Sequence, residues 1–449
     1  MVARVRTWAG GLPERHGGKL ALVALGLILV LALGLRLERA VNSDTDPRRD
    51  SQNYARIATA LYEDGRFGDE DMVNASDYSP GAPMFFAAMY VVGGAPFPER
   101  ALIGVALLGA AMVLLVYLLG RRLMGRSPPR AAAAAGLLAA LGAAIYPPYL
   151  EYNGRLMSEP VGAFLVAAAV LAYLWALDRP ARLRRWLVPG ALLGAAVMTR
   201  PEYLAVAAGL GLVALIVVAR RSGRGDGLRG AALLLVACAA VLAPWTIRNA
   251  LVLDRLVPVS TGAGKAFFIG TYLPGDGFEI ETKAELARRF RAPSESLDQL
   301  LDRVAAERPE LDRDRALSRA GRENLGDYAW GEPLDYAAML AAKAERIWWR
   351  GPGGTEPPGA WTAVHRLLVV LGAGALIMLA LRRRVEAAVL AVPLLGISAV
   401  GTLLLAATRR TVPLMPLVLA LSAVALVVLA RAAGERIAAR RAVRRPMPV

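Results

Sequence analysis

Residues 20–37 read LALVALGLILVLALGLRL, an apolar run that meets its first charge only at Arg36. A helix needs about twenty predominantly apolar residues to cross the hydrocarbon core of a bilayer. A cleaved secretory signal would have a shorter apolar core, followed by a cleavage site of small residues. Because the uncharged part of this run ends at Leu35 and is followed by Arg36, Glu38 and Arg39, we expect an uncleaved, membrane-anchoring span.

Similar apolar runs recur along the chain and predict a polytopic, all-α membrane protein. The fifth and sixth runs are separated only by Arg200-Pro201, but joined together they would be too long for a single crossing. We therefore expect a bundle of about ten transmembrane helices, at 20–37, 100–120, 129–146, 157–177, 186–200, 202–219, 230–247, 361–381, 386–406 and 411–430.

The composition agrees with this class. The 449 residues are 56% hydrophobic and 20% charged, and the formal net charge is +16. In a soluble protein such a charge would suggest nucleic-acid binding. Here the arginine clusters lie between apolar runs, where membrane topology explains them, so no nucleic-acid partner is expected.

Charge also predicts the orientation in the membrane. If the N-terminus lies in the cytoplasm, every connection on that side carries more Arg and Lys than Asp and Glu. The first outer loop, 40–99, has four Arg against ten Asp or Glu. This asymmetry follows the positive-inside rule and predicts a multi-pass plasma-membrane protein with both termini cytoplasmic.

The expected organisation has five parts. They are a cytoplasmic N-terminus (1–19), a membrane module of seven spans (20–248), an outer loop region (249–360), a module of three spans (361–430) and a basic cytoplasmic tail (431–449).

Two of the expected outer segments are long, the loop 40–99 and the segment 249–360. The loop 40–99 should contain a helix from about Asp50 to Tyr62 and a short interfacial piece from Met84 to Val92. The segment 249–360 should contain helices near 283–290, 296–307 and 312–347.

Asp50 is the first candidate for chemistry, because it places a carboxylate just beyond the first span, in an acidic loop. An aspartate at the start of a helix is ordinarily an N-cap. Held beside a lipid-linked substrate, the same carboxylate could act as a general base toward an acceptor hydroxyl. The sequence leaves both interpretations open.

Ionisable residues at the outer ends of later spans form a second group. Glu159 lies at the outer end of the fourth span, and ionisable groups at that depth usually face the protein interior or a wet cavity. Basic residues on the outer side run against the charge rule, so they need another reason. They either pair with the acidic loop 40–99 or bind an anionic ligand such as a lipid phosphate, which arginine can grip with two hydrogen bonds. These residues are Arg200, Arg248, Arg409 and Arg410.

Metal and redox chemistry have little support. Cys238 is the single cysteine, so no intramolecular disulfide can form. The two histidines, His16 and His365, are far apart in the sequence and form no cluster. We assign no metal ligand and no certain cofactor, although carboxylates could still bind a divalent metal ion.

Several motifs resemble those of the bacterial polyprenyl-phosphate-sugar glycosyltransferases of the GT-C fold. This superfamily includes the protein O-mannosyltransferases (family 39) and the lipid A aminoarabinose transferases. The similarity runs from about residue 20 to 430, with the motifs in the family's order. They are DSQNYARIATALYEDGRF (50–67), SPGAPMFFAAMYVVGG (79–94), YNGRLMSEPV (152–161), GALLGAAVMTRPEYL (190–204), APWTIRNALVLDRLVPVSTGAGKAFFIGTY (243–272) and RRTVPLMP (409–416).

The resemblance implies transfer of a sugar, with inversion, from a polyprenyl-phosphate carrier to an extracytoplasmic acceptor. The carrier, the membrane lipids and the acceptor (a lipid, a glycan or a protein) are the implied partners. By the matching motifs, Asp50 would be the general base. The implied substrate-binding residues are Tyr54, Glu159, Arg200, Arg248 and Arg410.

The chain departs from the family pattern at three places. Ser51 follows Asp50 where the better-known branches have Glu, and Ala82 replaces an aromatic residue in the interfacial turn. The lysine that the aminoarabinose branch carries beside its paired prolines is absent from DYSPGAP (77–83). These differences leave the donor sugar and the acceptor open.

Two other functions remain as alternatives. A transporter or flippase of lipid-linked sugars would place charges at mid-span and show repeated halves. Spans two to four and seven to ten are almost free of mid-span charge, which argues against it. A polysaccharide polymerase or ligase would use a diphosphate-linked oligosaccharide. Donor-binding assays that compare monophosphate with diphosphate carriers would separate it from the enzyme expected here.

Overall fold

The structure is a computed structural model that describes residues 17–43, 50–69, 72, 75–350 and 359–443. Throughout these ranges every regular element is a helix, which confirms the expected all-α membrane class. Residues 1–16 and 444–449, parts of the two expected cytoplasmic ends, lie outside the described ranges. The bundle contains α2 (Gly17–Val41), α5 (Pro98–Leu123), α6 (Pro129–Ile145), α7 (Pro147–Asn153), α8 (Ser158–Leu177), α9 (Leu187–Thr199), α10 (Tyr203–Ser222), α11 (Arg224–Leu253), α17 (Gly359–Leu381), α18 (Val385–Leu403) and α19 (Met415–Val443).

Most of these helices match the expected spans closely. Within the described ranges, eight are long and apolar enough to cross a membrane. The number becomes nine if α6 and α7, bent by 49° at their break, count as one span. The fifth expected span, 186–200, corresponds to α9, whose 13 residues are short for a crossing.

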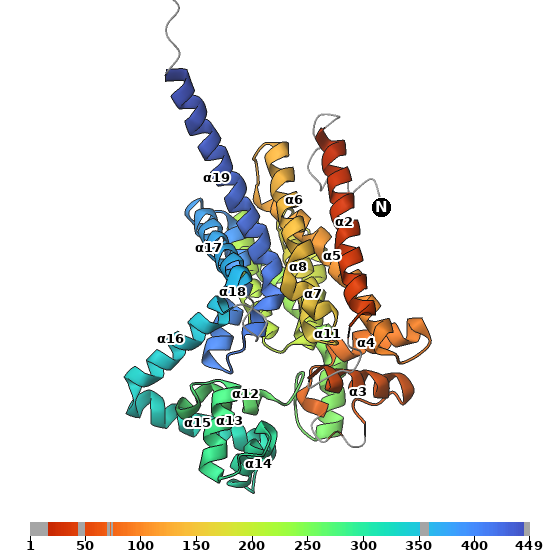
Figure 1. Cartoon of the computed structure of the whole chain (residues 1–449), viewed down its shortest axis with the longest axis vertical. Coiled ribbons are helices and arrows are strands. Elements are labelled where there is room, and N and C mark those ends of the chain that lie inside the picture. Colours follow the sequence, from red (N-terminus) through yellow and green to blue (C-terminus); the bar gives the residue numbers. More distant parts are fainter. Residues whose placement is uncertain (1–16, 44–49, 70–71, 73–74, 351–358, 444–449) are drawn as a thin grey trace, which may run out of the picture.

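The path of the chain shows what α9 does. It follows α8 through residues 178–186, which include the 3₁₀ turn η2 (Leu183–Trp186). At its other end, Arg200 contacts Glu159 in the first turn of α8. Helix α9 therefore runs back along α8 and returns the chain to the end of the bundle where α8 began. Figure 1 shows the start of α2 and the end of α19 at one end of the bundle, as the even number of expected crossings requires.

The remaining elements gather at the opposite end (Figure 1). The expected helix from Asp50 is present as α3, and the expected interfacial piece is α4, which buries Phe86 and Tyr90 and exposes Val91 and Val92. Both are held against the bundle, since α4 packs on α3 and α5. These elements are α3 (Asp50–Glu63), η1 (Ala75–Asp77), α4 (Gly81–Gly93), α12 (Ala263–Thr271), η3 (Leu273–Gly275), α13 (Glu279–Phe290), α14 (Leu297–Ala306), α15 (Arg313–Gly331) and α16 (Pro333–Trp349).

The long helix expected over 312–347 is two helices, α15 and α16. The break comes at Glu332, whose backbone leaves the helical region at φ −131° and ψ 57°. Pro333 explains it, because proline disfavours helical geometry in the preceding residue and lacks the N–H that would continue the helix. The break redirects α16 toward the bundle, where it packs against α18 and the 3₁₀ segment η4 (Thr408–Leu414).

Arg36 lies completely buried among α2, α5 and α6, although the sequence suggested only a charge at the end of the first span. Its guanidinium donates to the carbonyl oxygens of Ala143 at 2.8 Å and Ala144 at 3.1 Å, in the last turn of α6. In a continuing helix these carbonyls would accept from residues 147 and 148. Both of those residues are proline and have no N–H to donate. Arg36 therefore satisfies two carbonyls that would otherwise stay unpaired within the bundle.

We expect Arg36→Met to lower the free energy of unfolding by about 2 to 3 kcal/mol, because two buried carbonyls lose their donors. Thermal unfolding in detergent measures the effect. Arg39→Met is the matched control, since the Arg39 side chain is 60% exposed. Replacing Pro147 and Pro148 by alanine in the Arg36→Met background restores two donors and should recover part of the loss. Equal stability of the two single variants would contradict this role of Arg36.

Candidate active site

Asp50 opens α3 and faces an arginine from the far end of the sequence. The Arg409 Nη1 atom lies 2.6 Å from Asp50 Oδ2. The Tyr78 hydroxyl donates to the other carboxylate oxygen at 3.4 Å, and the Asn53 amide donates to that hydroxyl at 2.6 Å. The Asp50 and Arg409 side chains are 37% and 35% exposed, so the pair is accessible from outside the protein.

Glu159 continues the network inward. It lies in the first turn of α8 and its side chain is completely buried. Arg200 Nη1 lies 3.1 Å from Glu159 Oε1, and Arg409 Nε lies 3.9 Å from the same oxygen. The partial positive charge at the start of a helix also favours a carboxylate there. Glu159 thus links Arg200 to the arginine that holds Asp50.

Two further residues complete a chain of alternating charges. Arg200 Nε lies 3.0 Å from Glu202 Oε1, and Arg410 Nη1 lies 3.4 Å from that oxygen. All three side chains are only 12% exposed. We call this set the charge network: Asp50, Arg409, Glu159, Arg200, Glu202 and Arg410.

Local sequence explains how these charges meet. Helix α9 ends at Thr199, and Pro201 prevents it from continuing, so Arg200 and Glu202 occupy a short turn before α10. Arg409 and Arg410 are neighbours in the 3₁₀ segment η4, where successive side chains point about 120° apart. Arg409 accordingly faces Asp50 and Glu159, whereas Arg410 faces Glu202.

The network sets the ionisation of its members outside the spans. Burial acts to raise the pKa of Asp50, but the charge and hydrogen bond of Arg409, with help from Lys265 and Tyr78, outweigh it and lower that pKa below its usual value. Burial likewise opposes ionisation of Glu202, and Arg410 and Arg200 overcome it, so the pKa of Glu202 is also lowered. Asp50 and Glu202 are therefore carboxylates at neutral pH.

Arg410 retains an unused donor. Its Nε atom is buried and makes no hydrogen bond within the described part of the chain. Buried donors without partners are rare in folded proteins. This N–H is therefore a free donor inside the charge network.

Tyr54, which the family resemblance implied as a substrate-binding residue, lies beside the network. Its buried ring packs edge-on against Tyr78 at 5.3 Å between ring centroids. Burial, first, and the nearby Glu159 raise the pKa of the Tyr54 hydroxyl, which stays protonated. The hydroxyl also hydrogen-bonds with Ser158, the neighbour of Glu159.

Arg248 is the one expected site residue that the structure places apart. Its guanidinium lies over the Trp245 ring at 4.8 Å and over the Phe67 ring at 5.7 Å from the centroids. It also donates to Asn249 Oδ1 at 3.0 Å. Among the described residues no ion pair joins it to the charge network. The sequence indicated the correct end of the bundle but not the side of α11 on which Arg248 lies.

Sequence and structure comparisons bear on this arrangement. The sequence model of a family described as dolichyl-phosphate-mannose-protein mannosyltransferase matches residues 77–247. The oligosaccharyltransferase AglB from Archaeoglobus fulgidus, solved with an inhibitory peptide and a dolichol-phosphate, superimposes with a TM-score of 0.58 at 15% identity. The alignment covers 97% of this chain and 53% of AglB. The chain has the GT-C fold.

Two other solved structures extend the comparison. AglB tethered to an acceptor peptide with the NVT sequon gives a TM-score of 0.55 at 16% identity, covering 91% of this chain and 49% of AglB. ArnT from Cupriavidus metallidurans, bound to undecaprenyl phosphate, gives 0.40 at 19% identity, covering 94% of this chain and 80% of ArnT. This chain thus spans about half the length of AglB. No curated protein sequence matches it significantly.

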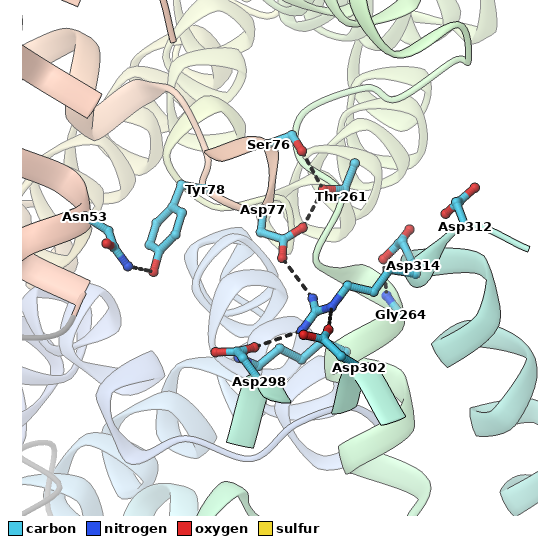
Figure 2. A network of polar contacts seen from close by, with 12 residues as sticks. Asn53, Ser76, Asp77, Tyr78, Thr261, Gly264, Asp298, Asp302, Asp312 and Asp314 are labelled. Carbon is cyan, nitrogen blue, oxygen red and sulfur yellow. Dashed lines mark hydrogen bonds and ion pairs between the residues drawn. The ribbon is translucent and has the colours of Figure 1, made fainter. Parts of the chain in front are cut away.

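On this GT-C bundle, a second polar network fixes helices α14 and α15. Figure 2 shows Asp77 of η1 facing Thr261, with Asp298 and Asp302 of α14 close by. Thr261 donates to Asp77 Oδ1 at 2.5 Å. Arg313 donates to Asp77 Oδ2 at 3.3 Å, to Asp298 at 3.0 Å and to Asp302 at 2.5 Å. One arginine of α15 therefore ties α14 and α15 to the segment 40–99, which carries Asp50.

Three residues of this region were missed by the sequence analysis. Glu202 has a simple signal, a carboxylate two residues after Arg200 at the mouth of a span. Tyr78 and Lys343 had no such signal in the sequence, because each reaches the site through packing of the segments 40–99 and 249–360 against the bundle. Within the described ranges no group of three or more His, Cys, Asp and Glu side chains is arranged to hold a metal ion.

Lys343 of α16 is completely buried, and its Nζ atom donates to the Gly270 carbonyl of α12 at 2.7 Å. Burial, first, and the charge of Arg410 lower the pKa of Lys343 to about 7. In the unfolded chain a lysine titrates near 10.4. Between these two pH values the unfolded chain holds a proton that the folded protein has released. Stability therefore rises as the pH increases from about 7 to about 10.

We expect the slope from Lys343 alone to approach about 1.4 kcal/mol per pH unit within that window. Lys343→Met should remove the slope, and Lys283→Met should not, because Lys283 is exposed on α13. The measurement is the thermal midpoint in detergent at several pH values between 7.5 and 9.5. An unchanged pH dependence in Lys343→Met would show that Lys343 keeps its proton in the folded protein.

Proposed function

We propose that this chain is an integral membrane glycosyltransferase that moves a sugar from a polyprenyl-phosphate carrier to an extracytoplasmic acceptor with inversion. The observation that carries the proposal is the charge network, which joins an accessible carboxylate to three arginines at the mouth of a GT-C bundle. The match of residues 77–247 to a mannosyltransferase family supports it. AglB, with the same fold, was solved with a dolichol-phosphate.

In this mechanism Asp50 is the general base. Its lowered pKa keeps it ionised, so it can accept the proton of an acceptor hydroxyl as the oxygen attacks the anomeric carbon. The bond from that carbon to the phosphate oxygen breaks on the opposite face, and the electron pair leaves with the phosphate. A single displacement of this kind inverts the configuration at the anomeric carbon.

The arginines would stabilise the negative charge on the leaving phosphate. Arg410 offers a buried N–H that has no partner among the described residues, and Arg409 is accessible beside Asp50. Glu159 is buried between Arg200 and Arg409 and orients both. Tyr54 lines the same place, while Arg248 stays a candidate for binding a more distant part of the substrate, over its aromatic neighbours.

We also propose the orientation in the membrane. The end of the bundle with α3, α4 and α12–α16 would be extracytoplasmic, and both termini would lie in the cytoplasm of a cell with this protein in its plasma membrane. The distribution of arginine supports it, since the connections at the opposite end are the basic ones.

The test is transfer by purified protein in proteoliposomes. Radiolabelled sugar is supplied on a polyprenyl monophosphate or on a polyprenyl diphosphate, with a mixed extract of envelope acceptors. We expect transfer from the monophosphate carrier. Transfer from the diphosphate carrier alone would favour the polymerase or ligase alternative, and movement of labelled carrier across the bilayer without transfer would favour the flippase.

A further inference from the structure

A basic cavity lies at the end of the bundle opposite the charge network. Its volume is about 1020 Å³, and it lies between the end of α5, the start of α6, the α17–α18 connection and α19. The lining contains one acidic residue, Glu386. Six arginines line it: Arg121, Arg122, Arg126, Arg382, Arg384 and Arg431.

The framework of this cavity is held by specific contacts. Arg384 donates to the Leu123 carbonyl at 2.5 Å and lies 2.8 Å from Glu386 Oε1. Its guanidinium packs on Gly125, where any side chain would collide with it and where φ is +60°. Arg122 pairs with Asp178 at 2.5 Å. These contacts join α5, α8 and the α17–α18 connection, so the cavity is a built feature of the fold.

Three arginines of the cavity have donors without a partner in the described part of the chain. The Arg122 Nε atom is buried and makes no hydrogen bond among the described residues. The guanidinium groups of Arg126 and Arg382 are exposed at the rim, and no ion pair or hydrogen bond to either is found within the described ranges. The cavity therefore carries more positive charge than the described residues neutralise.

The wall of the cavity changes from charged to apolar toward the membrane. Leu118 lies one turn before Arg121 and Arg122 on α5, and Ala132 lies just inside the start of α6. A free phosphate ion would use only the arginines. An amphiphile would place its phosphate on the arginines and its hydrocarbon along Leu118 and Ala132.

We propose that this cavity binds the headgroup of an anionic glycerophospholipid from the leaflet at that end of the bundle. Arginine pairs with phosphate through parallel, charge-assisted hydrogen bonds, and basic pockets between transmembrane helices suit such headgroups. The site is separate from the charge network and does not depend on the proposed transferase activity.

The experiment uses the full chain purified in an uncharged detergent. Phosphatidylglycerol is added, and bound lipid is counted by native mass spectrometry and by titration of the thermal midpoint. The double variant Arg126→Gln/Arg382→Gln removes two rim charges that hold no other part of the fold. The control, Arg436→Gln/Arg440→Gln, removes the same charge from exposed positions on α19 outside the cavity.

We expect the rim variant to bind phosphatidylglycerol at least about tenfold more weakly than the wild type, and the control to stay within about twofold. Phosphatidylcholine should not bind to the site. Equal losses in both double variants would show only nonspecific attraction and overturn the proposal. Inorganic phosphate stabilising as well as the lipid, or polyprenyl phosphate binding where phosphatidylglycerol does not, would also overturn it.

Discussion

Asp50→Asn is expected to lower the rate of sugar transfer by a factor of about 10² to 10⁴, the usual contribution of a general base. Asparagine keeps the shape and one oxygen acceptor but cannot take a proton. The measurement is the initial rate of transfer in proteoliposomes with saturating labelled carrier. Glu63→Gln is the matched control, because it removes one exposed carboxylate from the same helix.

The Asp50 variant also loses its ion pair with Arg409, so a structural effect must be separated from a chemical one. A lost base lowers kcat and leaves donor binding largely intact, whereas a collapsed site weakens both. Donor affinity measured on Asp50→Asn makes the distinction. Transfer at the wild-type rate would end the assignment of Asp50 as base.

Arg409→Gln gives an independent readout on the same pair. Since Arg409 lowers the pKa of Asp50, its removal should raise that pKa toward the ordinary value or above it. A base is active only when ionised, so the acid limb of the pH–rate profile should move to higher pH. An acid limb that does not move would mean that another group titrates.

The apolar runs and the charge asymmetry of the sequence predicted the membrane fold well. Period and length of apolar segments fix where helices lie, and the sign of the connecting charges groups their ends on two sides. That grouping is why Asp50, Glu159, Arg200 and Arg410 could be expected at one end of the bundle. The structure shows these four in one network.

The lateral arrangement of the helices was not predictable in the same way. Hydropathy places a residue at a depth in the membrane but leaves open which neighbour its helix faces. Arg248 has the expected depth and yet lies over Trp245 and Phe67. The sequence indicated only that Arg36 marks the end of the first span. Its role as a donor to the Ala143 and Ala144 carbonyls depends on Pro147 and Pro148, and packing of α2 against α6 brings these residues together.

The largest expected effect on stability comes from Glu159→Gln, which should lower the free energy of unfolding by about 3 to 5 kcal/mol. The Glu159 side chain is completely buried and lies 3.1 Å from Arg200, which is itself only 12% exposed. Glutamine keeps the size and an acceptor oxygen but removes the charge between two arginines. The cost is large because it leaves buried positive charge with too few partners.

Thermal unfolding in detergent measures this effect, with Glu151→Gln as control. Glu151 lies at the same end of the bundle and pairs with Arg155 at 3.1 Å, but their side chains are 36% and 54% exposed. A surface pair of this kind contributes about 0 to 1 kcal/mol. Similar losses in the two variants would show that Glu159 is solvated rather than buried.

A double-mutant cycle with Arg200→Met isolates the pair itself. If Glu159 and Arg200 are coupled in the folded protein, the double variant should lose less stability than the two single variants together, because no unpaired charge remains between them. The same cycle applied to transfer rates connects stability to chemistry. Arg409 contacts both Glu159 and Asp50, so a fall in kcat for Glu159→Gln with donor binding retained would show that the buried glutamate positions the arginine beside the base.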